Sequence, residues 1–135
     1  MRLGKADHRS WVLWATDCAE RVLPCFETQN PNDNRPREAI AAGRAWVRGH
    51  ISCGEARAAA RAAARDAADD PAARASARAA GHAAATAHVV GHARHAAAYA
   101  VKAAHAMDTT DGDAAATKER EWQVRRLPDH LRSVV

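Results

Sequence analysis

The sequence predicts an all-α protein, a compact bundle of five or six helices with alanine-rich helices at its centre. Alanine supplies 37 of the 135 residues and has the highest helix propensity, whereas β-branched residues are scarce. Apolar residues also recur at helical spacing through most of the chain. The length suits one hydrophobic core, so we expect a single helical domain over residues 1–135.

The first helix is expected to begin with Asp7 as its N-cap, because a short acidic side chain suits that position. Its apolar stripe runs from Trp11 through Cys18 to Phe26, and Pro24 lies inside this pattern. Proline lacks a backbone donor and clashes with the preceding turn. The helix should therefore kink or stop at Pro24.

The segment ETQNPNDNRP follows as a loop, because it is rich in Asn, Asp and Pro. Asp33 or Asn34 can cap the second helix, and Pro36 suits its first turn. Ile40 lies on the inner side of this helix, which should end near Gly49.

A third helix is expected to open at Ser52 or Cys53 and to run to about Ala68. Asp70 and Pro71 then mark a boundary, since aspartate favours the N-cap and proline the first helical position. A further helix should therefore start at Pro71.

From Pro71 the helical pattern continues to about Met107. Unbroken, this helix would be about 50 Å long at 1.5 Å per residue, which is too long for a compact domain of this size. We therefore expect a break, at Val90-Gly91 rather than at Gly81. The two arms would form an alanine-rich central hairpin.

A last helix is expected from about Ala114 to Arg126, before Pro128 ends it. This helix should bring Trp122 back to the core. Most other large aromatic side chains also lie outside the alanine-rich block. We therefore expect tryptophans of flanking helices to fill the gaps between closely packed alanine faces.

The stretch HVVGHARHAAAY contains the most distinctive polar pattern in the chain. His88, His92, His95 and Tyr99 stand at i, i+4, i+7 and i+11, so a continuous helix would place them on one face. The pair His88 and His92 has a spacing at which two imidazoles can reach one divalent metal ion, such as zinc, nickel or iron. A metal-dependent enzyme at this site is one hypothesis.

A catalytic metal would need a third protein ligand. His95 or His50 could supply it, and Asp17 and Glu20 are further candidates. The alternative is a polar seam of the core, in which the imidazoles supply bulk and hydrogen bonds. This alternative is favoured and requires no cofactor, because paired histidines on helices are common and three-ligand sites are rarer.

Basic residues exceed acidic ones, with a formal net charge of +4. Two stripes of arginines could lie along nucleic-acid phosphates, namely Arg57, Arg61 and Arg65, followed by Arg74 and Arg78. Acidic residues interrupt the stripes and no aromatic residues interleave to stack bases. A solvated helix face is therefore favoured, and nucleic acid is not the expected partner.

The three cysteines, Cys18, Cys25 and Cys53, form no C-x-x-C pair, which is typical of reduced thiols in a cytosolic protein. Cys18 lies on the apolar stripe and is expected to be a small buried hydrophobe. No stretch is apolar enough to span a membrane, and the N-terminus lacks the apolar core of a secretory signal. We therefore expect a cytoplasmic protein without a membrane partner and, because no nucleophile motif is present, without catalysis.

Three segments stand out, and the first two are the more specific: DCAERVLPCFE (17–27), DNRPREAIAAGRAWVRG (33–49) and ARAAGHAAATAHVVGHARHAAAYAVKAA (77–104). They resemble a bacterial family of small, all-helical immunity proteins, similar to immunity protein five of polymorphic toxin systems. The resemblance covers about residues 8–131. It implies a cytosolic protein that protects its own cell by binding a cognate toxin, and it brings no catalytic residues with it.

The charged residues of the first two segments are expected to be structural, because helix caps and rim ion pairs account for them without a ligand. They are Asp17, Glu20, Arg21, Asp33, Arg35 and Arg37. The segment from Asp33 to Arg37 would cap a helix. Asp17 and Arg21 form an i, i+4 pair that could tie the first helix to a neighbour.

Three functions remain, in this order. The first is an immunity protein that binds and neutralises a cognate bacterial toxin. The second is a metal-dependent helical-bundle enzyme, a hydrolase or transferase, that uses His88 and His92. The third is a basic helical protein associated with nucleic acid. Close packing of small-residue faces would also allow a homodimer.

Overall fold

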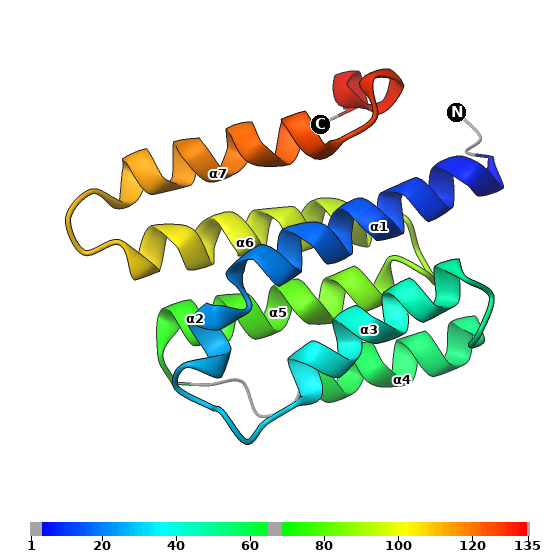
Figure 1. Ribbon diagram of the computed structural model, residues 1–135, viewed down its shortest axis with the longest axis horizontal. Coiled ribbons are helices and arrows are strands. Elements are labelled where there is room, and N and C mark those ends of the chain that lie inside the picture. Colours follow the sequence, from blue (N-terminus) through cyan, green and yellow to red (C-terminus); the bar gives the residue numbers. More distant parts are fainter. Residues whose placement is uncertain (1–3, 65–68, 135) are drawn as a thin grey trace.

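The computed structural model describes residues 4–64 and 69–134 (Figure 1). These residues form seven α-helices and a final 3-10 helix, Asp129–Val134, with no strand among them. The helices are α1 (Lys5–Val22), α2 (Pro24–Glu27), α3 (Arg35–Val47), α4 (Cys53–Ala64), α5 (Pro71–Ala85), α6 (His92–Met107) and α7 (Gly112–Arg126). The all-α prediction is confirmed.

The predicted count of five or six helices is wrong, because Pro24 separates a short additional helix from the end of α1. The chain turns at Leu23, and α2 begins with Pro24 at a position where its missing N–H costs nothing. The predicted end of the third helix, near Ala68, lies outside the described residues.

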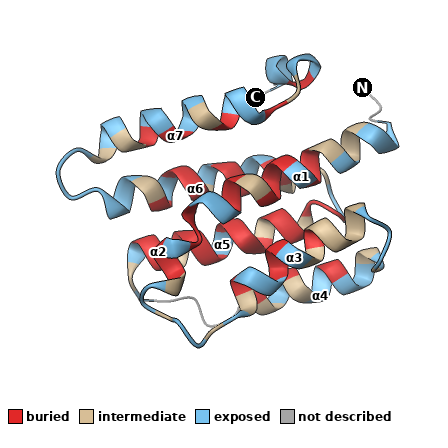
Figure 2. Ribbon diagram, in the orientation of Figure 1, coloured by how far each residue is buried: buried red, intermediate tan, exposed pale blue. Residues whose placement is uncertain are grey.

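The helices form two layers. Helices α4, α5, α6 and α7 lie side by side in that order, and α1 and α3 pack across them (Figure 1). Helix α1 contacts α5 and α6, whereas α3 contacts α4 and α5. Helix α5 therefore has neighbours on three sides, and it is mostly buried (Figure 2).

The core between the layers combines alanine with large aromatic residues. Buried alanines line α5 and α6, while Trp11, Trp14 and Phe26 each keep only 4% of their surface exposed. Trp11 and Trp14 pack edge to face, with ring centroids 5.5 Å apart. The expectation that flanking aromatics fill the gaps between alanine faces agrees with this packing. Trp122 is half-buried and packs against the edge of the core.

Helix α1 crosses α3 closely at one small residue. Gly43 of α3 is buried, and a Cβ built on it would lie 2.8 Å from Cγ2 of Thr16 in α1. Any side chain at position 43 would therefore force the two helices or the Thr16 side chain to move. Glycine is required here for the close approach of the helices.

The helix starts show which cap predictions hold. Asp70 accepts a hydrogen bond from the Ala73 N–H at 3.0 Å, which confirms it as the N-cap of α5. The prediction for the first helix is wrong, because Gly4 is the N-cap and Asp7 lies in the first turn. Its carboxylate is instead 2.9 Å from Nε2 of His130. Extra residues N-terminal to Asp7 simply continue the helix.

Two further caps follow local side-chain chemistry. Ser52 and Glu55 bond reciprocally across the start of α4, with Ser52 Oγ accepting from the Glu55 N–H at 3.1 Å. Asn34 holds the N-cap position of α3 without a side-chain bond, and Asp33 accepts from the Arg35 N–H instead. Pro36 lies in the first turn of α3, as predicted.

The long alanine-rich pattern is broken where expected. Helix α5 ends at Ala85 and α6 begins at His92, so Val90 and Gly91 lie in the connection. The two helices return antiparallel along each other and form the central hairpin of the bundle (Figure 1). This break decides which histidines meet.

Candidate functional site

The predicted histidine face is divided by the turn between α5 and α6. His92, His95 and Tyr99 lie on α6, whereas His88 lies in the turn and is exposed. The expectation that all four side chains share one helical face is therefore wrong. An i, i+4 pair shares a face only within one continuous helix, and His88 precedes the start of α6.

The α6 histidines instead meet His82, which comes from α5. Nδ1 of His82 lies 2.9 Å from Nδ1 of His92, and the ring of His82 stacks on Tyr99 with centroids 5.4 Å apart. The rings of His82 and His95 are 5.1 Å apart. We call these four residues the histidine cluster. Sequence reasoning missed His82, although a hairpin turning near Val90 places it opposite His92.

Protonation of the histidine cluster is suppressed by its surroundings. Burial, together with the neighbouring His92, His95 and Arg78, lowers the pKa of His82 to about 4. Burial also lowers the pKa of His92, with a contribution from His95. Both imidazoles are therefore neutral at physiological pH, so one ring can donate to the other.

The candidate third ligands of a metal lie elsewhere. His50 is exposed in the turn after α3, and Asp17 and Glu20 on α1 both bind the guanidinium of Arg44. Among residues 4–64 and 69–134, no three His, Cys, Asp or Glu side chains are arranged to hold a metal ion. The described geometry offers at most a pair of imidazoles.

His88 has a different neighbour. Its Nδ1 lies 3.5 Å from Sγ of Cys53, the first residue of α4, and the same sulfur is 3.7 Å from the Ala87 carbonyl oxygen. Cys18, by contrast, is fully buried, and burial raises the pKa of its thiol well above the usual range. The expectation that Cys18 is a small buried hydrophobe is confirmed.

Charged residues of the first two sequence segments tie helices together. Arg44 of α3 bonds to Asp17 at 2.9 Å and to Glu20 at 2.7 Å, which joins α3 to α1. Arg126 of α7 also reaches Asp17, at 3.1 Å. Hydrogen bonding by Arg44 lowers the pKa of Glu20, so this carboxylate stays ionised and paired.

Arg21 does not form the i, i+4 pair with Asp17 that the spacing predicts. Its Nε lies 3.0 Å from the carboxylate of Glu119 on α7, and its guanidinium covers the ring of Trp122 at 4.4 Å. Only 9% of the Glu119 side chain is exposed, and its Oε2 has no hydrogen-bond partner. Asp17 is half-buried and is already paired with Arg44 and Arg126, whereas Glu119 has no other cation within ion-pair distance among the described residues.

Two further arginines of the second segment, at the start of α3, also form ion pairs. Arg35 bonds to Asp33 through Nε and Nη2, and Arg37 bonds to Glu27 of α2. These contacts lower the pKa of both carboxyl groups. The charged residues of the two segments therefore fix the positions of α1, α2, α3 and α7 relative to one another.

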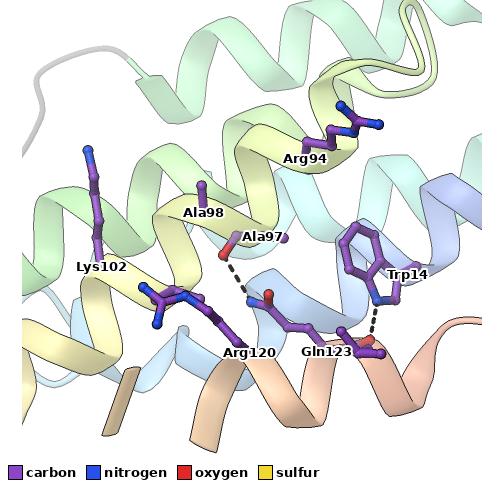
Figure 3. Close-up of a pocket in the computed structure, with 9 residues that line it drawn as sticks. Trp14, Arg94, Ala97, Ala98, Lys102, Arg120 and Gln123 are labelled. Atoms are coloured by element: carbon purple, nitrogen blue, oxygen red, sulfur yellow. Dashed lines mark hydrogen bonds between the residues drawn. The ribbon is translucent and has the colours of Figure 1, made fainter. Parts of the chain in front are cut away.

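A hollow lies between α6 and α7, and we call it the α6/α7 groove (Figure 3). Its volume is about 490 Å³, within the range of small-molecule sites. Ala97, Ala98, Val101 and Val124 form apolar walls, and Arg94, Lys102 and Arg120 place cations around it. Gln123 donates through Nε2 to the Ala97 carbonyl at 2.9 Å, while its own main-chain carbonyl accepts from Trp14 Nε1 at 2.7 Å.

The predicted arginine stripes are only partly described. Arg65 lies outside the described residues, Arg57 and Arg61 are exposed on α4, and Arg78 is exposed on α5. Arg74 donates to the main-chain oxygen of Asp69 at 2.6 Å. None of the described helices combines the length and the apolar character that a membrane span requires.

Comparison with known protein families identifies the family of this chain. A family model described as "Imm-5 like putative immunity protein" matches residues 1–130. The chain belongs to this family. No curated protein and no solved structure was found to be similar to it. The three segments that carry the resemblance lie inside the matched range, and the charges of the first two serve the ion pairs described above.

Proposed function

We propose that this protein is an immunity protein that acts in the cytoplasm by binding and neutralising a cognate bacterial toxin. One observation carries the proposal: the immunity-protein family model matches residues 1–130, nearly the whole chain. Neutralisation by binding needs a stable scaffold with an accessible surface, and it needs no reacting groups.

The arrangement of charges supports a scaffold role for the family segments. Arginines of the first two segments form ion pairs between helices, as in Arg44 with Asp17 and Arg21 with Glu119. Such pairs fix the relative positions of helices rather than leave groups poised for chemistry. The faces of α4 to α7 that lie away from these pairs remain accessible for a partner.

Co-expression tests the proposal directly. The toxin encoded by a gene neighbouring that of this protein is induced in a bacterial host with and without this protein. The expected result is growth arrest by the toxin alone, restored growth with both proteins, and a 1:1 complex on size-exclusion chromatography. Failure to rescue growth with any neighbouring toxin candidate would overturn the proposal. The same chromatography, run on this protein alone, tests for the homodimer that close packing of small-residue faces would allow.

Metal binding is a second candidate, favoured by one observation. His82 and His92 place their Nδ1 atoms 2.9 Å apart, close to the separation of two nitrogens that bind one metal at right angles with bonds of about 2.0–2.1 Å. Elemental mass spectrometry of untagged protein, before and after dialysis against a chelator, measures the content of zinc, nickel and iron. One equivalent of metal per chain in the wild type that is absent from His92→Ala would support this candidate. Folded, metal-free protein would remove it.

A further inference from the structure

Some cations of the described residues are paired with carboxylates, as Arg21, Arg37, Arg44 and Arg126 are across α1, α2, α3 and α7. Exposed cations with no ion pair to a described residue occur in both layers, and Arg9 on α1 and Arg48 after α3 are examples. Four such cations lie on neighbouring helices of one layer: Arg61 on α4, Arg78 on α5, Lys102 on α6 and Arg120 on α7. All four are exposed. We call these four residues the cationic face.

The four cations are neighbours in space, although they come from four helices. Arg61 and Arg78 border a hollow of about 190 Å³, and Arg78 and Lys102 border another of about 230 Å³. Lys102 and Arg120 in turn border the α6/α7 groove (Figure 3). No Asp or Glu occurs among the described residues that line these three hollows. Asp113 lines a further hollow of about 340 Å³ that Lys102 and Arg120 also border. With four cations beside this one carboxylate, the face carries an excess of positive charge.

The cationic face lies on the side of α5 that no helix covers. Helix α5 is flanked by α4 and α6 and overlaid by α1 and α3, so its exposed residue Arg78 must point away from the core. Tyr99 adjoins two of these cations, with the Arg78 Cζ at 5.9 Å and the Lys102 Nζ at 5.0 Å from the centre of its ring. Arginine and tyrosine are the residues that most often dominate protein interfaces.

The α6/α7 groove supplies an apolar anchor point beside these charges. Val124 is 41% exposed at the groove, and Gln123, only 5% exposed, lines it. Oε1 of Gln123 accepts no hydrogen bond from the described residues, because only its Nε2 is engaged, with Ala97. A partner can therefore place an apolar side chain against the walls and donate one hydrogen bond to the floor.

We propose that the cognate toxin docks through an acidic surface onto the cationic face, with an apolar side chain in the α6/α7 groove and carboxylates against Arg78, Lys102 and Arg120. This inference rests on the proposed function and adds the contact surface and the charge of the partner. A protein fits better than nucleic acid, because Tyr99 is already stacked on His82 and is half-buried, which leaves no free ring for a base.

Charge reversal tests the face. The probe is the toxin domain made catalytically inactive, and its Kd is measured by isothermal titration calorimetry for the wild type, for Arg78→Glu/Arg120→Glu and for the matched control Arg9→Glu/Arg48→Glu. The residues of both pairs are exposed, and both double variants change the net charge equally. Arg9 and Arg48, however, belong to the other layer, where Arg9 lies in α1 and Arg48 directly follows α3. We expect about 100-fold weaker binding for the first pair and less than about threefold for the control.

A second pair of variants tests the groove. Ala98→Trp places a large side chain at an exposed wall of the groove, and Ala41→Trp places the same side chain at an exposed position of α3. Ala98→Trp is expected to weaken toxin binding by about tenfold or more, with unchanged binding for Ala41→Trp. Thermal unfolding of all variants serves as the control that each one is folded.

The outcomes separate this inference from the proposed function. If the wild type does not bind the toxin domain, the proposed function fails. If the wild type binds and Arg78→Glu/Arg120→Glu binds equally well, the toxin uses another surface and only this inference is overturned. Equal losses in both charge-reversal pairs also overturn it, since the effect is then one of net charge. Tight binding of a nucleic-acid duplex that the first pair abolishes would assign the face to nucleic acid instead.

Discussion

At the scale of single residues, His82 combines burial with the cationic Arg78 and two further imidazoles as neighbours. Its ring packs between Tyr99 and His92 and faces His95 and Arg78, so a proton on it would be poorly solvated and repelled. The pKa of His82 falls from 6.5 to about 4 as a result. The unfolded chain therefore takes up this proton at a higher pH than the folded protein does.

The first prediction is a loss of stability in acid that depends on His82. Well above pH 6.5 neither state is protonated there, and the full stability is present. As the pH falls from 6.5 to about 4, protonation of the unfolded state removes stability. The loss from this residue should be about 1–2 kcal/mol, because the ring is partly solvated. Urea unfolding at both pH values measures it.

The matched variant is His82→Phe, which keeps a ring to stack on Tyr99 but cannot titrate. Its free energy of unfolding should fall less between the two pH values than that of the wild type. Equal slopes in both proteins would show that other groups, such as the paired carboxylates, account for the acid sensitivity.

At the scale of helices, close approach at Gly43 sets how α1 lies on α3. The second prediction is that Gly43→Ala destabilises the protein by about 1–2 kcal/mol. Alanine favours the helix by up to about 1 kcal/mol, but its methyl group meets the buried Thr16 Cγ2 at 2.8 Å, and such overpacking costs about 1–3 kcal/mol. Chemical denaturation measures the difference.

A compensating variant identifies the clash as the cause. Thr16→Ser removes the offending methyl group and keeps the hydroxyl that donates to the Leu13 carbonyl at 2.8 Å. The double variant Gly43→Ala/Thr16→Ser should therefore be more stable than Gly43→Ala alone. If the double variant lost as much stability as the two single variants together, the result would contradict this account.

The third prediction concerns the tie between α1 and α7. Arg21→Met should cost about 2 kcal/mol, because it leaves the carboxylate of Glu119 buried without its cation. Glu119→Gln should cost less, since a neutral amide needs no counter-charge. In a double-mutant cycle the two substitutions together should cost less than Arg21→Met alone. A double variant with the sum of both losses would show that the pair is not coupled.

The sequence was sufficient to predict those helix ends that depend on local chemistry. Asp70 and Pro71 start α5, and Val90-Gly91 lies in its connection to α6, because capping, proline geometry and helix length act over a few residues. It was insufficient for Asp7, because N-terminal residues without a strong breaker can extend a helix past a good cap.

Contacts between helices could not be obtained in the same way. Spacing within one helix suggested His88 with His92 and Asp17 with Arg21, whereas the fold pairs His82 with His92 and Arg21 with Glu119. Each true partner comes from another helix, and its identity depends on how the hairpin and α7 are packed. The residue types of the site were therefore predictable, but their partners were not.

At the scale of the whole molecule, the charges are arranged unequally around the bundle. Ion pairs neutralise the cations that join α1, α2, α3 and α7, while the cationic face on α4 to α7 carries an excess of positive charge. A patch with an excess of one sign attracts an oppositely charged partner over distances of about one Debye length. Association should therefore respond to salt even though the net charge is only +4.

The last prediction is that salt slows association with the toxin much more than it speeds dissociation. Raising the salt concentration from about 50 to about 500 mM shortens the Debye length several-fold, so steering by the cationic face is lost. The association rate constant measured by stopped-flow fluorescence should fall by about tenfold or more. For Arg78→Glu/Arg120→Glu the rate constant should be low at both salt concentrations. A wild-type rate constant that does not change with salt would show that apolar contact in the α6/α7 groove, rather than charge, brings the partners together.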